Sequence, residues 1–257
     1  MLASKLRSAS MFASFVMAAG MTAACAESAA PKAASAGANG GSTAASADSA
    51  TRLSAAQLAI APIGATAAVG DIAGLERALE RGLDAGLSIS QTREILVQVY
   101  AYAGFPRSLN ALNTLMKVLQ ARKQRGITDT EGTPPTALPA DADLTAMGTE
   151  TQTRLSGAPV KGPLFEFAPA IDHYLKAHLF GAIFARDNLD WRARELATVG
   201  MLSGMTGVEP QLQAHIRISL NAGLTAAQLR QLPAALREQG AAQAATRLEA
   251  ALAQGAR

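Results

Sequence analysis

An internal repeat constrains the fold of this chain more than any other feature of its sequence. Segment 75–88 (LERALERGLDAGLS) aligns without gaps on segment 212–225 (LQAHIRISLNAGLT), and five positions are identical. Each copy has helical spacing of its apolar residues, reaches a glycine, and then opens the next helix with a capping box, Ser88 with Gln91 and Thr225 with Gln228. We interpret the two segments as copies of one helical unit.

The composition favours helices throughout. Ala and Leu are abundant, aromatic residues make up 4% of the chain, and no stretch alternates apolar and polar residues with the period of a strand. We therefore predict an all-α fold. The spacing of apolar residues, caps and glycines predicts helices over 53–68, 72–84, 91–103, 108–125, 165–186, 191–205, 210–222 and from 225 onward.

The first 25 residues are typical of an export signal. Lys5 and Arg7 precede an apolar stretch, and the only cysteine of the chain, Cys25, follows it. Two cleavages remain open: an A-x-A site at Ala24-Cys25-Ala26 would release a soluble protein, whereas a lipobox ending at Cys25 would leave a lipid anchor. We expect a periplasmic or secreted protein, attached to a membrane only through a lipid on Cys25.

Residues 26–52 are nearly all small or polar and predict a flexible tether, because such a segment cannot bury enough apolar surface to become ordered. The formal charge of +3 becomes 3 − 2 = +1 once Lys5 and Arg7 leave with the signal. This charge supports no nucleic-acid surface. The rest of the chain contains no cysteine, which excludes disulfides and thiol chemistry there.

The folded part divides into three segments. We predict a first module over 53–125, a connection over 126–163 that is rich in Gly, Pro, Thr and Asp, and a second module over 164–257. A connection of this length is often functional, and it is a candidate cover for a pocket.

Segment 191–225 contains the best-placed histidine. Asp190 is a suitable N-cap for the first helix of this segment, and the small residue Gly200 would let another backbone approach that helix closely. In the second helix, His215 lies beside the apolar stripe and borders the core, whereas the first copy has Ala78 at this position. No carboxylate lies at the helical spacing from a histidine that would indicate a metal site, so we predict neither a metal nor a cofactor.

Three stretches resemble the carboxymuconolactone decarboxylase family, whose superfamily includes the alkylhydroperoxidase D-like proteins. They are YAYAGFPRSLNAL at 100–112, FAPAIDHYL with FGAIFARDNLDWRARELAT between 167 and 198, and EPQLQAHIRISLNAGLT at 209–225. The resemblance covers roughly 54–236. It implies an alkylhydroperoxidase D-like helical bundle, here built from two related modules, that acts on a small molecule and assembles into homotrimers or homohexamers.

The resemblance also implies where a site would lie. In the peroxidase branch the site is Glu, then Cys-x-x-Cys, then His. His215 corresponds to that histidine and Glu195 lies near the glutamate position, but Val208 and Gln211 stand where the cysteines would be. A dithiol peroxidase needs a thiolate, so we do not expect that activity, and a peroxiredoxin-type label inherited through the family would not describe this chain.

The decarboxylase branch works without cysteines, and this favours a carbon–carbon lyase that acts on a small unsaturated carboxylic acid or lactone. Such chemistry needs a proton donor and a cation or polar group that holds the substrate. The catalytic candidates are His215, Glu195 and Glu209, and the substrate-binding candidates are Arg194, Tyr102 and Arg107. The alternative is a non-catalytic exported helical oligomer that binds a small ligand.

The two modules have different sequences after the shared part of the repeat, so each contains residues there that the other lacks. We therefore predict that they complement each other. His215 of the second module should meet the segment 100–107 of the first, where Gly104 ends a helix and Phe105-Pro106 form a turn. The expected separation of His215 from Tyr102 is less than about 12 Å, roughly one helix diameter.

Overall fold

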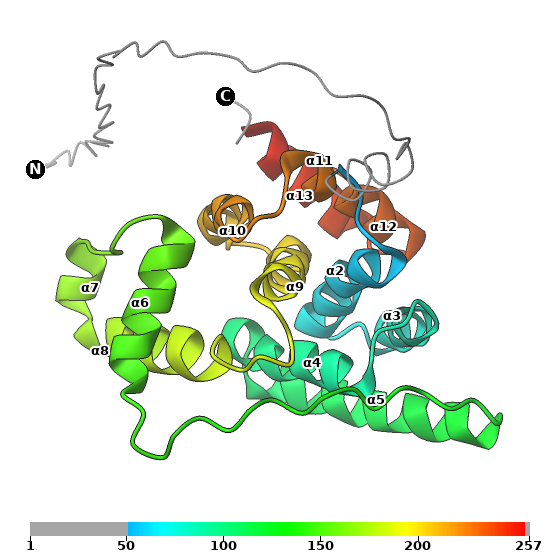
Figure 1. The fold of residues 1–257 in the computed structure, drawn as a ribbon. Helices are drawn as coiled ribbons and strands as arrows, with labels where there is room; N and C mark the ends of the chain where they lie inside the picture. Colours follow the sequence, from blue (N-terminus) through cyan, green and yellow to red (C-terminus); the bar gives the residue numbers. More distant parts are fainter. Residues whose placement is uncertain (1–50, 255–257) are drawn as a thin grey trace, which may run out of the picture. The chain divides into compact units, whose positions relative to one another are not determined.

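The structure is a computed structural model that describes residues 51–254. Every regular element in 51–254 is a helix, and this confirms the all-α prediction (Figure 1). The predicted export signal and residues 26–50 of the predicted tether lie outside the described residues. The elements are α2 (Ala55–Val69), α3 (Ile72–Asp84), α4 (Ile89–Ala103), α5 (Phe105–Gln124), α6 (Leu144–Ser156), α7 (Pro163–Phe167), α8 (Pro169–His173), the π-helix η1 (Tyr174–Ile183), α9 (Trp191–Gly204), α10 (Glu209–Asn221), α11 (Ala226–Leu229), α12 (Leu232–Glu238) and α13 (Ala242–Gln254).

The helix starts follow the sequence signals closely. Ser54, Ser88 and Thr225 each form a complete capping box with the glutamine three residues later. Asp190 caps α9 by accepting the amide of Ala193 at 2.8 Å. Polar side chains therefore fix where these four helices begin.

Two sequence predictions of local structure were wrong. Phe105 and Pro106 do not form a turn, because they are the first residues of α5 and Gly104 alone, with φ 85° and ψ 160°, turns the chain. Residues 165–186 do not form one helix. Ala168 precedes a proline, leaves the helical region (φ −129°, ψ 70°) and separates α7 from α8, as the steric effect of proline on its preceding residue predicts.

The centre of the fold is a close crossing of α2 and α9 (Figure 1). A Cβ placed on Gly64 would lie 2.6 Å from the carbonyl oxygen of Ala197, and one placed on Gly200 would lie 2.2 Å from that of Ala61. The two glycines therefore allow backbone contact from both sides, as the small residue in the 191–205 segment predicted. The contact is reciprocal, since Gly64 and Ala61 correspond to Gly200 and Ala197.

The flanking helices repeat this correspondence. α3 packs on α2 and α5, and α10 packs on α9 and α13. Similarly, α4 packs on α5 and α9, while α12 packs on α13 and α2. The two-module organisation stays a prediction, and the matching order of these contacts supports it.

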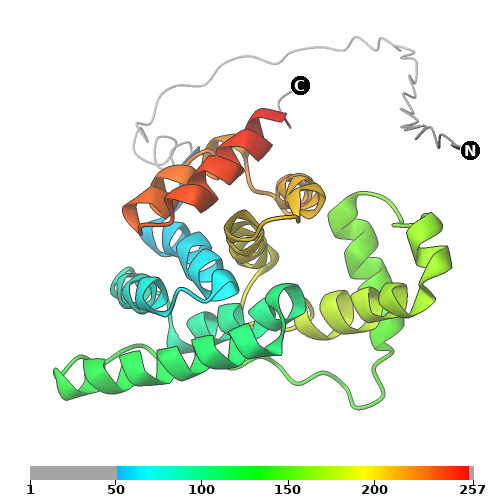
Figure 2. The same cartoon turned by 180° about the vertical axis from the view of Figure 1, so that it is seen from behind.

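The predicted connection contains α6, which pairs with η1. A Cβ on Gly148 would lie 1.7 Å from the carbonyl oxygen of Lys176, so the two backbones touch there. In both Figure 1 and Figure 2, α6, α7 and α8 stand to one side of the other helices.

The start of the connection is held by the buried guanidinium of Arg122, which binds Asp129 at 2.8 Å and Glu80 at 2.6 Å. None of the helices within 51–254 is long and apolar enough to cross a membrane.

Candidate active site

Glu195 on α9 and His215 on α10 form a buried hydrogen-bonded pair. The Nδ1 atom of His215 lies 2.8 Å from Oε2 of Glu195, and the two residues expose 8% and 0% of their surface, respectively. Because a carboxylate only accepts, Nδ1 carries the proton and donates it, which leaves Nε2 of a neutral imidazole with a free lone pair. No residue of 51–254 hydrogen-bonds Nε2. His215 therefore has one nitrogen held by Glu195 and the other available.

Tyr102, in the last turn of α4, completes this arrangement from the first predicted module. Its ring meets the ring of His215 edge-on, with centroids 5.6 Å apart, well inside the separation predicted from the sequence. Burial raises the pKa of the Tyr102 phenol, and the neighbouring charge of Glu195 raises it further, so the hydroxyl stays protonated. Neither this hydroxyl nor Oε1 of Glu195 has a hydrogen-bond partner within the described residues, although both are buried.

A polar ladder on α4 positions α9. Glu94, Gln98 and Tyr102 are four residues apart, so they lie on one face of α4. The amide of Gln98 donates to the hydroxyl of Thr198 at 2.8 Å and to the carbonyl oxygen of Arg194 at 3.1 Å. Sequence reasoning missed this ladder. The pattern that would have revealed it is the four-residue spacing of polar side chains among Ile95, Leu96 and Val99.

The structure corrects the substrate-binding expectation for Arg194. Its guanidinium is fully buried and binds Glu94 at 3.0 Å, Gln98 at 3.0 Å and the carbonyl oxygen of Arg186 at 2.7 Å. Burial lowers the pKa of Arg194, whereas Glu94 opposes that shift. For Glu94 itself burial favours a raised pKa, but hydrogen bonds and charge from Arg186 and Arg194 outweigh burial and lower it. Arg194 joins α9 to α4 and is not free to bind a substrate.

The remaining two candidates lie elsewhere. Glu209 is exposed at the start of α10, where its carboxylate accepts the amide of Gly207 at 3.1 Å, and these backbone bonds lower its pKa. Arg107 is exposed and rests against Gly70 at the end of α2, because a Cβ there would lie 1.6 Å from its Nη1. No hydrogen bond or ion pair within 51–254 links either residue to His215. Their roles in a site stay predictions.

An aromatic group belongs to the segment 100–107 that the sequence predicted to meet His215. Tyr100 stacks on Phe105 with centroids 4.5 Å apart and meets His178 edge-on at 5.3 Å. Tyr100 and Tyr102 both pack against the core cluster that contains Ile218 of α10. The surroundings of the dyad are therefore apolar and aromatic, with a few polar atoms.

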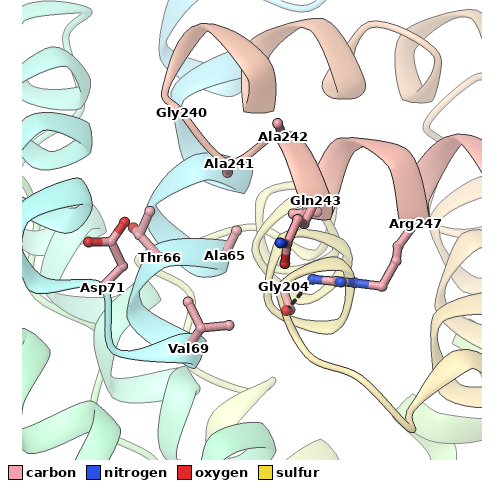
Figure 3. A pocket seen from close by; sticks show the side chains of 11 residues that line it. Ala65, Thr66, Val69, Asp71, Gly204, Gly240, Ala241, Ala242, Gln243 and Arg247 are labelled. Atoms are coloured by element: carbon pink, nitrogen blue, oxygen red, sulfur yellow. Dashed lines mark hydrogen bonds between the residues drawn. The ribbon is translucent and has the colours of Figure 1, made fainter.

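The molecule also contains cavities outside this site. One of about 430 Å³ lies where the ends of α2 and α9 meet the start of α13, and none of the predicted site residues lines it (Figure 3). There Arg247 donates to the carbonyl oxygens of Ser203, at 2.7 Å, and Gly204, so it caps the end of α9. Within 51–254, no cluster of three or more His, Cys, Asp and Glu side chains could hold a metal.

Comparison with known proteins agrees with the fold. Residues 169–254 match the model of the carboxymuconolactone decarboxylase family. This part of the chain, which contains both Glu195 and His215, is therefore a carboxymuconolactone decarboxylase-like, alkylhydroperoxidase D-like domain. No curated protein matches the chain.

Proposed function

We propose that the protein is a cofactor-free lyase that uses His215 and Glu195 as an acid/base dyad on a small unsaturated carboxylic acid or lactone. The observation that carries the proposal is the buried hydrogen bond between Nδ1 of His215 and Glu195, beside the unpartnered hydroxyl of Tyr102. A histidine held in one tautomer by a carboxylate can transfer a proton through its other nitrogen.

In the decarboxylation we propose, the bond between the carboxylate and a conjugated carbon breaks and CO₂ leaves. The electron pair remains on the substrate, where the adjacent unsaturation spreads it onto an oxygen. Protonated His215 then gives its Nε2 proton to that carbon, so each CO₂ released consumes one proton. Water restores the proton, because the side chain of His215 is 10% exposed.

Glu195 and Tyr102 act on the charges that develop. The carboxylate of Glu195 stabilises the imidazolium through Nδ1, since a buried charge needs a paired partner. The protonated hydroxyl of Tyr102 is a hydrogen-bond donor for negative charge that grows on a substrate oxygen. Thiol chemistry plays no part, because residues 51–254 contain no cysteine.

Turnover of carboxymuconolactone and of a panel of unsaturated acids, followed by ultraviolet absorbance, tests the proposal. We expect His215→Ala to lower kcat by roughly 10²- to 10⁴-fold, the range of general acid/base catalysis. His173→Ala is the matched control, because His173 is exposed on α8. Absence of turnover by the folded wild-type protein would overturn the proposal and favour a ligand-binding protein.

Export and self-assembly are further parts of the proposal. An exposed apolar stripe along α5 supports a homo-oligomer: Phe105, Leu109 and Met116 are between 56% and 68% exposed. Light scattering should give a mass above that of one chain, and Leu109→Lys should reduce it. Fractionation of the expressing cell should place the protein in the periplasm, in the medium or, if Cys25 is lipidated, in the membrane.

A further inference from the structure

A second cavity, of about 600 Å³, opens between the predicted connection and the start of α9. Met147 and Thr151 of α6 line one side, Phe184 and Leu189 line the floor, and Trp191 starts the wall formed by α9. The volume is within the range of small-molecule pockets, which are mostly apolar with a few placed polar groups. Flat, soft side chains such as tryptophan, phenylalanine and methionine favour a planar apolar ligand.

Four charged side chains line this cavity, and three of them are already compensated. A further cation lies beside it, since the guanidinium of Arg154 is 5.0 Å from the centroid of the Trp191 ring. Asp187 accepts the amide and hydroxyl of Thr136 at 2.8 and 2.6 Å. Asp190 accepts the amide of Ala193 at 2.8 Å, and Arg186 binds Glu94 at 2.8 Å. Arg192 is the fourth, and it makes no hydrogen bond or ion pair with any residue of 51–254.

The backbone places Arg192 at the cavity. A Cβ placed on Gly223 would lie 3.0 Å from Nη2 of Arg192, so the guanidinium rests against the end of α10. Glycine suits position 223 for a second reason, because its φ of 96° lies in the left-handed region that favours glycine. Ala222, the residue before it, lines the cavity. The guanidinium of Arg192, an exposed residue, therefore lies against the end of α10 at the edge of the cavity.

We propose that this cavity binds a planar, apolar monocarboxylate, with the ring against Trp191 and the carboxylate on Arg192. A guanidinium and a carboxylate form paired charge-assisted hydrogen bonds, which gives Arg192 the partner that the protein does not supply. The site is separate from the dyad, although α9 and α10 contribute residues to both. Trp191 precedes Glu195 by about one turn of α9, and Ala222 follows His215 by about two turns of α10. The proposal does not depend on the proposed function.

Trp191 is the only tryptophan in the chain, so its fluorescence reports directly on the cavity. Titration of the purified protein with benzoate and 2-naphthoate should change this fluorescence saturably. Arg192→Gln should weaken benzoate binding at least about tenfold, the scale of a lost charge-assisted hydrogen bond. Calorimetry gives the same constants without relying on Trp191.

Three variants and one neutral ligand make the test specific. Arg217→Gln removes one exposed charge elsewhere on α10 and should leave binding unchanged. Ala222→Leu should block the cavity, and His215→Ala should abolish turnover without affecting benzoate binding. Equal affinity for benzamide and benzoate, equal weakening by Arg217→Gln, or absence of any binding at millimolar benzoate would overturn the proposal.

Discussion

The helix pair α9–α10 and the helix pair α2–α3 meet through reciprocal glycine contacts but carry different side chains. In α9, Glu195 lies two residues before Ala197, which touches Gly64; in α2, Ala59 lies two residues before Ala61, which touches Gly200. Likewise, His215 corresponds to Ala78 in the repeat. The corresponding positions thus hold a hydrogen-bonded Glu–His pair in α9 and α10 and two alanines in α2 and α3. The comparison separates residues that build the fold from residues added to it.

The largest expected effect concerns the glycine contacts. Gly200→Val should destabilise the protein by about 4 kcal/mol, because its side chain would collide with the backbone of α2 rather than with a movable side chain. Urea denaturation measures the change. Ala253→Val, exposed on α13, should cost less than about 0.7 kcal/mol, the scale of helix propensity. Similar losses for both variants would show that the crossing is not tightly packed.

The next effect concerns the polar ladder on α4, whose side chains hydrogen-bond residues of α9. Arg194→Met should destabilise by about 3 kcal/mol, since it leaves Glu94 buried with only the partly exposed Arg186 as an ionic partner. Thermal or urea unfolding measures the loss, with Arg217→Met as the control for removal of an exposed charge. A loss under about 1 kcal/mol would mean that Arg194 does not tie α9 to α4.

The same ladder predicts a dependence on pH. The pKa of Glu94 is lower in the folded protein than its usual value of 4.5, so its contribution is complete above that value and is lost as the pH falls below it. Glu94→Gln should therefore flatten the acid limb of the stability profile. An unchanged acid limb in the variant would assign the dependence to other carboxylates.

The smallest effect on stability should come from making the two pairs alike. Glu195→Ala with His215→Ala installs the residues that α2 and α3 already have, and it should change the free energy of unfolding by less than about 1 kcal/mol. Buried polar pairs contribute little net stability, so the substitution should remove function and keep the fold. A loss above about 3 kcal/mol would identify the dyad as a structural element.

The fold was accessible from the sequence because its determinants are local. Capping residues such as Ser88 and Thr225, helical spacing and Gly200 predicted the helix starts and the close crossing. The internal repeat and the family resemblance singled out His215, whose position beside the core was also visible from spacing. These features depend on residues a few positions apart.

The partners of each side chain were less accessible because they depend on packing between distant helices. Arg194 and Glu195 are neighbours in the sequence, yet one faces Glu94 on α4 and the other faces His215 on α10. No local pattern distinguishes these two directions. For the same reason, the sequence alone could not show that neither Glu209 nor Arg107 hydrogen-bonds His215.

The most direct test of the account is a mutant cycle on the dyad. With a substrate found in the turnover panel, kcat/KM is measured for the wild type, Glu195→Gln, His215→Gln and the double variant. If the pair acts as a unit, kcat/KM falls roughly 10²- to 10⁴-fold in each single variant. The double variant then has a kcat/KM no lower than that of the less active single variant. Multiplicative losses, or wild-type activity in His215→Gln, would contradict the central claim.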